Sequence, residues 1–591
     1  MLADSARSGA CHYPHWREIL SDSSFRACEP EIRPVSIPRD RGPSPKVSAP
    51  SAPHPLPREH ASAITRSPPE RPRRSDPAER DGRSTTASPH RRTAHRCAEP
   101  TRLRAESAQV AAGSGAAGGS GVLRACRTGG TTPREFPGAP TRLKRVNTHA
   151  RLVQDYEAGI GVTASRISPA PDPGSNLAAT LPVWALAAGS IAALATAANR
   201  MRTARGLDPV AHRLDPARIT AAFSSERLLR IGGRMPTPFA DLSGFFPTFD
   251  GWVRTHANYS HHRARLFATL GLPDSAPIDL AVAQMAMIRA SDLEEQAAAH
   301  GAIAVRVRTE EEWAASPQGQ AAAAGPLVAI TDRPDRGETG LPAGAAPLQP
   351  LRGVRVLDLT RVIAGPVATR ALALLGADVL RVDPPQLPEI SWQFADTCQG
   401  KRSTLVDLRT HGIDDLVAAA DVLITGYRPG ALERAGVRAA ARPGLIHGRV
   451  SAWGEAGPWG ERRGFDSIVQ AASGISIVEG APAVPGALPA QALDHASGYL
   501  LAAGVIDALV ARSGDGVGRD VRVALARTAS WLLDAPDRTP RHPKPAMPSA
   551  AHVVRHGQVV TAPPVLAEYP DYASPAPAYG ADHPAWPLPT H

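Results

Sequence analysis

Between residues 353 and 453, short apolar runs alternate with single amphipathic patterns. The apolar runs predict strands at 353–359, 377–383, 403–408, 421–427 and 445–453, and the helical periods predict helices at 365–375 and 413–420. Strands that are apolar on both faces and are joined by single helices indicate a parallel sheet covered on both sides. We therefore expect an α/β fold in residues 350–535, with a Rossmann-like sheet that binds its ligand at the carboxyl ends of the strands.

Residues 215–345 show helical periodicity interrupted by short polar breaks, which predicts a mostly helical module. Thr309, with Glu312 three residues later and just ahead of Trp313, indicates a capping box at a helix start. His256 and the His261-His262 pair fall in a polar helical pattern, which favours a solvated surface over a metal site.

The stretch from Leu177 to Ala198 has no charged residue and is long enough to span a membrane. It consists mostly of alanine and contains Pro182, so a buried helix is favoured over a membrane span. Its residues from Leu186 to Leu194 also match those from Leu501 to Leu509 in register. This match suggests that 177–345 is the second half of a degenerate first copy of the later domain.

The two ends of the chain are rich in Pro, Arg and Ser, which predicts disordered tails at 1–173 and 536–591. Residues 1–150 carry 25 of the 66 basic and 14 of the 56 acidic residues, so the net charge of +10 belongs to the N-terminal tail. No aromatic stacking platform accompanies this charge, so nucleic-acid binding ranks last among the functions considered.

Other motifs exclude several classes of protein. The GxGxxG pattern at 113–118 follows no strand and is interpreted as a linker. Cys398 is the single cysteine after residue 126, and no metal-ligand spacing occurs, so neither a disulfide framework nor a zinc site is expected. The N-terminus lacks a charged region followed by an apolar one, so we expect a cytoplasmic location.

Five sequence blocks carry a resemblance to a known family. They are "LRGVRVLDLTRVIAGPVATRALALLGADVLRVDPP" (351–385), "QGKRSTLVDLR" (399–409), "DVLITGYRPGALERAGV" (421–437), "LIHGRVSAWGEAGPWGERRGFDSIVQAASG" (445–474) and "ALDHASGYLLAAGVIDALVARSGDGVGRDVRVAL" (492–525). In this order they resemble the family III CoA transferases, the group that contains formyl-CoA and carnitine-CoA transferases and the α-methylacyl-CoA racemases.

The resemblance implies that Asp494 is a covalent nucleophile. It would attack an acyl-CoA thioester, pass through a mixed anhydride and become an aspartyl-CoA thioester that hands CoA to an acceptor carboxylic acid. The local sequence agrees, because an Ala-rich helix is expected to start near Ala496 and a helix N-terminus would keep the carboxylate ionised. The alternative is that Asp494 is only the N-cap of that helix.

The same resemblance implies CoA-binding positions. Lys401 and Arg434 stand where family members contact the nucleotide end of CoA, with ordinary surface charge as the alternative. Arg361 and Ile363 occupy the first loop, where transferases often carry His and Gln. Coenzyme A is thus expected as the acyl-CoA substrate, without a metal. The expected partners are an acyl-CoA, a carboxylic acid and a second copy of the chain in a homodimer, but no membrane and no nucleic acid.

Two departures from the family pattern bear on the rival functions, an acyl-CoA racemase or isomerase, which the first departure disfavours, and a non-catalytic subunit, which the second favours. A racemase moves a proton with a histidine just before the aspartate of a G-H-D motif, but this chain has Phe465 between Gly464 and Asp466, with His495 as the one nearby substitute. The glycine-rich loop that closes over the intermediate is not found after Arg527, which favours a degenerate, non-catalytic CoA-binding subunit. In the first copy, the Ala-Ala-Gly register puts Ala179 opposite Asp494, leaving one candidate site per chain.

Overall fold

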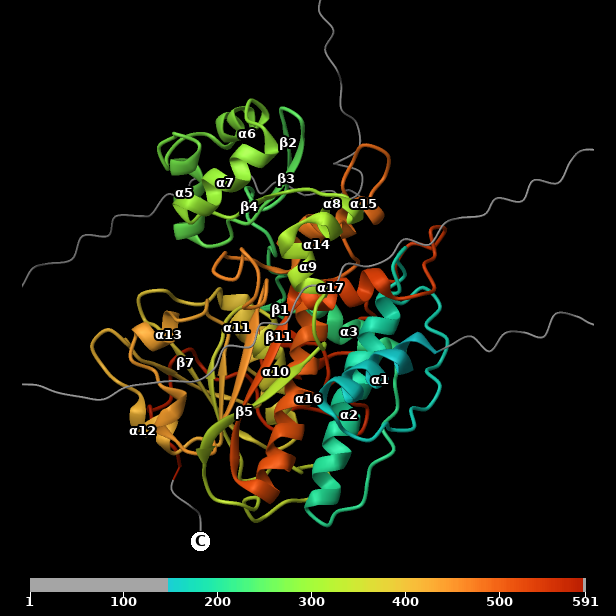
Figure 1. Cartoon of the computed structure of the whole chain (residues 1–591), viewed down its shortest axis with the longest axis vertical. Coiled ribbons are helices and arrows are strands. Elements are labelled where there is room, and N and C mark those ends of the chain that lie inside the picture. Colours follow the sequence, from blue (N-terminus) through green and yellow to red (C-terminus); the bar gives the residue numbers. More distant parts are fainter. Residues whose placement is uncertain (1–146, 588–591) are drawn as a thin grey trace, which may run out of the picture. The chain divides into compact units, whose positions relative to one another are not determined.

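A seven-stranded sheet forms the centre of the computed structural model, which describes residues 147–587 (Figure 1). The strand order is β5-β11-β10-β9-β6-β7-β8, with β5 antiparallel to β11 and every other pair parallel. The strands are β5 (Ala329–Arg336), β6 (Arg355–Leu359), β7 (Asp378–Asp383), β8 (Arg402–Leu405), β9 (Val422–Thr425), β10 (Ile446–Ser451) and β11 (Val517–Ala524). The expected α/β fold with a parallel sheet is confirmed.

The strand order reverses between β6 and β9. From β6 the chain runs outward through β7 and β8, then returns to the other side of β6 and runs outward through β9, β10 and β11. At such a switch point the loops after the two neighbouring strands diverge and leave a crevice at their carboxyl ends. The loops that begin at Thr360 and Gly426 therefore frame the position where a ligand is expected.

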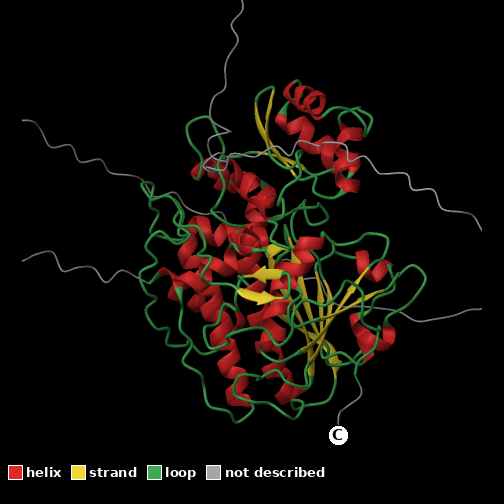
Figure 2. Ribbon diagram, turned by 180° about the vertical axis from the view of Figure 1, so that it is seen from behind, coloured by secondary structure: helices red, strands yellow, loops and turns green. Residues whose placement is uncertain are grey.

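Helices cover the two faces of the sheet unequally. Figure 2 shows from behind that most of the helices lie on one side of it. There α16 (Ala492–Asp515) packs on β10 and β11 and against α10 (Ala364–Leu374), and α2 (Val183–Ala204) and α1 (Thr148–Ile160) follow outward. On the opposite face, α12 (Asp414–Ala418) packs Leu416 and Val417 against Leu357, Leu380 and Leu423. The remaining elements of this half are α11 (Ser391–Thr397), α13 (Ala431–Arg434), α14 (Asp466–Ser473), α15 (Ile475–Val478) and α17 (Leu525–Asp534).

The uncharged stretch at 177–198 forms most of α2, which is a core helix. Leu186 and Leu194 are fully buried, and α2 packs along the length of α16. In residues 147–587, α16 is the one helix whose length and mean hydropathy would allow it to cross a membrane, and 94% of that apolar stretch is buried within the protein.

The pair α1/α2 repeats the geometry of the pair α10/α16. A Cβ atom at Gly189 would lie 2.8 Å from Leu152 Cβ, and one at Gly498 would lie 3.0 Å from Val367 Cβ, so each pair crosses closely at a glycine. The residues before α2 and α16 also share their backbone angles, φ −75° with ψ 60° and 62°. Matching Gly189 with Gly498 would place Ala185, rather than Ala179, opposite Asp494, and the duplication itself stays a prediction.

The module at 215–345 is less helical than expected, because it contains a three-stranded antiparallel sheet. Its strands are β2 (Phe245–Thr248), β3 (Gly251–Thr255) and β4 (Ala304–Arg306). Its helices are α3 (Pro216–Phe223), α4 (Ser225–Leu228), α5 (Ser260–Thr269), α6 (Ile278–Ala286), α7 (Ala290–His300), α8 (Glu310–Ala315) and α9 (Pro317–Ala323). The expected capping box of Thr309 and Glu312 is confirmed at the start of α8. Short strands of three to five residues were hidden by the helical patterns on both sides.

The predicted tails are wrong in part. Residues 148–160 form α1 instead of continuing a disordered tail, whereas 1–146 lie outside the described residues. In the C-terminal segment, β12 (Val554–His556) and β13 (Val559–Thr561) form a small sheet with β1 (Arg230–Ile231), and Leu566 and Tyr569 are buried. Extended, Pro-rich backbone can bury scattered large side chains against a finished core, which composition alone does not reveal.

Candidate functional site

Two aspartates meet at the N-terminus of α16. Asp494 is the third residue of that helix and is 6% exposed, and Asp466 is the first residue of α14 and is fully buried. Asp466 Oδ2 accepts hydrogen bonds from the backbone N–H groups of Leu493 (2.8 Å) and Asp494 (3.0 Å), and its other oxygen accepts one from the Gln470 amide. The anion that occupies the N-terminus of α16 is therefore Asp466.

This arrangement corrects the expectation that the helix N-terminus keeps Asp494 ionised. The helix starts at Ala492, earlier than predicted, and Gln491 is its N-cap, so the N-cap alternative for Asp494 is wrong. Burial and the neighbouring charge of Asp466 raise the pKa of Asp494 well above its usual range, and burial raises the pKa of Asp466 to about 6. In the described part of the chain, nothing donates a hydrogen bond to the Asp494 carboxyl group, so its oxygens remain available for chemistry.

Phe465, next to Asp466, contacts the module at residues 215–345. The ring of His256, just after β3, stacks on Phe465 with 3.7 Å between centroids and an angle of 9°. His256 and His262 are 5% and 6% exposed, so they are buried rather than on a solvated helix face. Burial lowers the pKa of His256 to about 3 and that of His262 to about 2, which keeps both imidazoles neutral.

His495, the substitute for the racemase histidine suggested by the sequence, faces a different environment. Its ring lies 5.2 Å from that of Phe223 in α3, and burial lowers its pKa to about 3. His256 is instead the imidazole that stacks on Phe465, and the His262 ring lies edge-on to Phe465 at 6.0 Å. The sequence had placed His256 on a solvated surface, because the module that carries it lies far upstream of Asp466.

The first loop of the sheet domain is held in a strained conformation. Val362 has φ +70°, a region that β-branched residues rarely adopt, and its N–H donates to Glu389 Oε2 at 2.9 Å. Glu389 also lies 3.6 Å from the Arg361 guanidinium, which packs over the Tyr259 ring at 4.9 Å. Ile363 is half-buried and is the N-cap of α10. The loop is thus held from two sides, by Glu389 and by the preceding module.

Lys401 is a core residue, which corrects its expected role at the nucleotide end of CoA. Its Nζ is fully buried and lies 3.2 Å from Asp358, 2.7 Å from Thr369 Oγ1 and 2.9 Å from the carbonyl oxygen of Pro366. These contacts join β6 to α10 and leave the ammonium no open side toward a phosphate.

Arg434 remains exposed at the end of α13. Its guanidinium folds back over Gly430, where a Cβ atom would lie 2.8 Å from Nη1. This position is open to solvent and to a ligand, so the assignment of Arg434 to CoA stays a prediction.

Three arginines without ion-pair partners in the described structure gather near the switch point. Arg428 follows β9, Arg463 precedes α14, and Arg265 comes from α5. Arg463 and Arg265 converge, since a Cβ atom at Gly301 would lie 2.9 Å from one Nη1 and 3.5 Å from the other. Burial and the charges of Arg428 and Arg265 lower the pKa of Arg463 to about 10. Guanidinium groups that lie close together without ion-pair partners are suited to phosphate.

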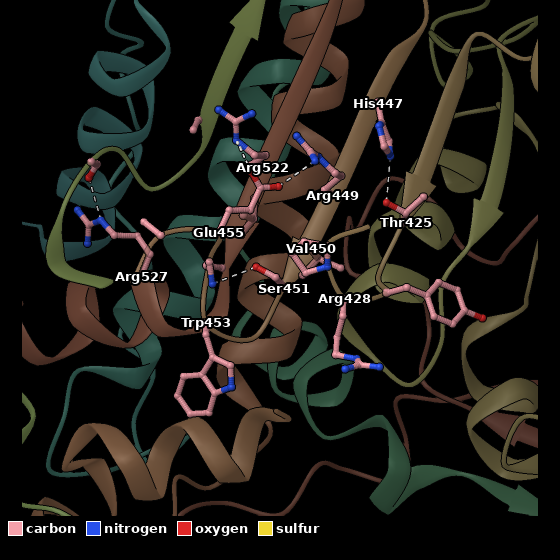
Figure 3. Close-up of a pocket in the computed structure, with 18 of the residues that line it drawn as sticks. Thr425, Arg428, His447, Arg449, Val450, Ser451, Trp453, Glu455, Arg522 and Arg527 are labelled. Atoms are coloured by element: carbon pink, nitrogen blue, oxygen red, sulfur yellow. Dashed lines mark hydrogen bonds and ion pairs between the residues drawn. The ribbon is translucent and has the colours of Figure 1, made fainter. Parts of the chain in front are cut away.

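A cavity of about 340 Å³ opens beside the carboxyl ends of β9 and β10 (Figure 3). Arg428 and Trp453 line it, and Arg449 pairs with Glu455 at 2.9 Å on its wall. The Trp453 indole also packs against Gly464, two residues before Asp466. Asp494 itself does not line this cavity. Over residues 147–587, no cluster of three or more His, Cys, Asp or Glu side chains is arranged to hold a metal ion.

Comparison with known proteins finds similarity to one family in the part of the chain that holds Asp466 and Asp494. Residues 351–537 match the model of CoA-transferase family III. The chain is 36% identical over 211 residues to a probable fatty acyl-CoA transferase of Mycobacterium tuberculosis, a match that covers 32% of this chain and 53% of that protein. It is 33% identical over 208 residues to the alpha subunit of succinyl-CoA–L-malate CoA-transferase of Chloroflexus aurantiacus, covering 31% and 49%.

Other matches have the same extent. The acetyl-CoA:oxalate CoA-transferase of Acetobacter aceti is 32% identical over 202 residues, covering 31% of this chain and 52% of that protein. A crystal structure of a hypothetical protein from Mycobacterium tuberculosis is 36% identical, with a TM-score of 0.30, and covers 33% of this chain and 57% of that one. The chain thus spans about half the length of the curated relatives it matches.

Proposed function

We propose that the chain transfers coenzyme A from an acyl-CoA to a carboxylic acid, with Asp494 as the covalent nucleophile, because residues 351–537 match the model of CoA-transferase family III. The observation that carries the proposal is the placement of Asp494. It is a carboxyl group with no hydrogen-bond donor in the described structure, fixed by its backbone to a second carboxylate beside the switch point of the sheet.

The proposed reaction conserves charge at every step. An Asp494 oxygen attacks the thioester carbon of the acyl-CoA, the C–S bond breaks, and CoA leaves as a thiolate. The thiolate then attacks the Asp494 carbonyl carbon of the mixed anhydride, which releases the donor acid as a carboxylate and leaves an aspartyl-CoA thioester. An acceptor carboxylate repeats these two steps in reverse, which yields the new acyl-CoA and restores the Asp494 carboxylate.

Asp466 has a positioning role in this proposal. By accepting the N–H groups of Leu493 and Asp494, it fixes the first turn of α16 and uses the donors that would otherwise hold the Asp494 carboxylate. An Asp494 oxygen without such donors is a stronger nucleophile once it is ionised. The cost is a raised pKa, so Asp494 must first give its proton to solvent.

The charge of CoA would be met by the three arginines near the switch point. Arg265, Arg428 and Arg463 have no ion pair in the described structure, and phosphate oxygens would supply the missing partners. Arg434 lies close in sequence to Arg428 and is a further candidate. A homodimer and a cytoplasmic location remain part of the proposal.

Intact-mass spectrometry of the full chain with a panel of acyl-CoAs, followed by trapping with hydroxylamine, tests this function. We expect an adduct on the peptide that contains Asp494, and its loss in Asp494→Asn. Asp507→Asn is the matched control, since Asp507 lies in the same helix but pairs with Arg200. Binding of CoA without an adduct on the wild-type chain would contradict transfer and support the non-catalytic CoA-binding subunit.

A further inference from the structure

A hollow of about 1420 Å³ lies at the amino ends of β6, β7 and β9, the opposite end of the sheet from the loops that begin at Thr360 and Gly426. The basic residues that line it are Arg336, Arg352, Arg355, Arg442 and Arg512. The acidic residues that line it are Glu338, Asp378 and Asp421, and Asp378 is already paired with Arg402 at 3.0 Å. The hollow therefore carries an excess of positive charge that the described residues do not balance.

Two of these arginines share a single carboxylate. Asp421 Oδ1 lies 2.9 Å from Arg442 and 3.2 Å from Arg512, and its Oδ2 accepts the backbone N–H of Arg355 at 3.0 Å. Arg512 is 5% exposed, and its buried Nε has no hydrogen-bond partner within residues 147–587. One carboxylate cannot neutralise two guanidinium groups, and a buried charge without enough partners is costly. The pair is therefore suited to a second anion.

Other arginines at this end of the sheet offer N–H donors without an anionic partner. Arg355 has no ion pair in the described structure, and its Nη2 donates to the Pro587 carbonyl oxygen at 3.2 Å. Arg352 is exposed and forms neither an ion pair nor a side-chain hydrogen bond with the described residues. Arg205, at the end of α2, donates from Nη1 to the carbonyl oxygen of Pro342 in the wall of the hollow, at 2.5 Å. Its Nε and Nη2 are buried and have no partner in residues 147–587.

We propose that this hollow binds a small polyphosphate anion through Arg352, Arg355 and Arg442. Planar guanidinium groups match phosphate oxygens with two parallel N–H donors, and several of them together balance more negative charge than one carboxylate supplies. Among the described residues, no aromatic side chain lines the hollow, so recognition would rest on phosphate and not on the stacking of a base. The inference does not depend on the transfer proposed for Asp494, which lies at the other end of α16 from Arg512.

A bound anion would connect segments that meet at the hollow. The linker after β5 packs on the end of α16, since the N–H groups of Gly337 and Gly340 donate to the carbonyl oxygens of Gly516 and Ser513, each at 2.8 Å. Arg352 precedes β6, and Arg442 precedes β10. A ligand held by these arginines would join the sheet to the linker and to α16. Because such a ligand binds the folded chain, it should also stabilise the fold.

Isothermal titration calorimetry of the full chain with tripolyphosphate tests the site, at an ionic strength held constant with sodium chloride. Arg352→Ala should weaken binding about 10-fold, and its combination with Arg442→Ala should weaken it about 100-fold. Arg352 has no side-chain partner in the described structure, so the single substitution should leave stability unchanged. ATP should bind within a few-fold of tripolyphosphate, because the hollow offers no ring to the base. Binding of ATP alone would overturn the inference.

Asp421→Asn should have the opposite effect. It keeps an oxygen for the Arg355 N–H but removes the negative charge that Arg442 and Arg512 share, so tripolyphosphate should bind several-fold more tightly. A purely structural role of these arginines predicts no such gain. Arg438→Ala is the matched control, because Arg438 is an exposed arginine four residues before Arg442 that does not line the hollow. It should bind tripolyphosphate as the wild type does.

Thermal melts give a second readout. Tripolyphosphate at 100 times its Kd should raise the midpoint of the wild type by about 3 °C and leave that of the double variant unchanged. Loss of binding in Arg463→Ala, with none in the double variant, would place the anion at the proposed CoA contacts and overturn the inference. No binding to the wild type, equal weakening by Arg438→Ala, or tighter binding of duplex DNA than of tripolyphosphate would overturn it as well.

Discussion

Asp466 accepts the backbone N–H of Asp494 at 3.0 Å, so the two carboxyl groups are joined through the peptide backbone rather than through a shared proton. The two carboxyl groups lie close together but differ in their hydrogen bonds. The Asp466 carboxylate accepts three hydrogen bonds. The Asp494 carboxyl group accepts none in the described structure, and its pKa is raised.

The pH profile of transfer should report this coupling. Because Asp494 attacks as a carboxylate and its pKa is raised, kcat/KM should increase with pH until Asp494 has lost its proton. Asp466→Asn keeps an oxygen for the two N–H groups but removes the negative charge, so the midpoint of the profile should move to lower pH. A midpoint that stays in place or moves upward would show that Asp466 does not set the ionisation of Asp494.

The stability of the fold should also depend on the ionisation of Asp494. A rise in pH that favours transfer should lower stability. A carboxyl whose pKa is higher in the folded than in the unfolded chain destabilises the fold as pH rises, because the unfolded chain loses its proton first. Asp494→Asn should therefore raise Tm at pH 8, and the gain should vanish below about pH 4, where both states are protonated. Thermal melts of the two proteins across this range test the sign, and a gain that persists at acid pH would contradict it.

Arg463 should contribute to the binding of CoA rather than to its chemistry. Arg463→Ala is expected to raise KM for an acyl-CoA by roughly 10- to 100-fold with little change in kcat, because it removes a charge-assisted contact to phosphate. Arg462→Ala is the matched control, since Arg462 is the adjacent residue and pairs with Glu295. Equal effects of the two substitutions would exclude a specific phosphate contact.

The close crossing of α10 and α16 should be sensitive to one methyl group. A Cβ atom at Gly498 would lie 2.5 Å from the Ala364 carbonyl oxygen, so Gly498→Ala should cost about 2 kcal/mol or more in the free energy of unfolding. At Gly514 in the same helix a Cβ atom would meet no atom within 4 Å, and Gly514→Ala should be neutral or stabilising. Chemical denaturation of the two variants gives the comparison.

The C-terminal segment should behave as packed structure. Leu566 is 1% exposed, so Leu566→Ala should cost about 3 kcal/mol in the free energy of unfolding. Met547 lies in the same segment at 64% exposure, and Met547→Ala should change stability by less than about 0.5 kcal/mol. If both substitutions proved neutral, the disordered tail predicted from composition would be reinstated.

The sequence predicted the sheet well because its strands are continuous apolar runs and therefore need little context. The expected strand at 377–383 and the observed β7 (Asp378–Asp383) differ by one residue at one end. The prediction of a disordered C-terminal tail was wrong for the opposite reason. Leu566 and Tyr569 are buried by a surface that other parts of the chain form.

The candidate site was predictable where a motif surrounds the residue and not elsewhere. Asp494 was found within a long matching block, but His256, whose ring stacks on Phe465 next to Asp466, comes from another module, and only the fold brings the two together. The CoA-binding role predicted for Lys401 was wrong, because the burial of Lys401 beside Asp358 depends on tertiary structure. A lysine within a matching motif does not reveal this burial. Charge and spacing identify candidates, whereas accessibility decides among them.

The packing of α2 against α16 has a consequence for synthesis on the ribosome. The apolar surface of α2 is complete when Ala204 has been made, but its partner does not begin until Ala492. At ordinary elongation rates this interval lasts on the order of tens of seconds. During that time the nascent chain carries a long alanine-rich surface that α16 covers only in the finished protein.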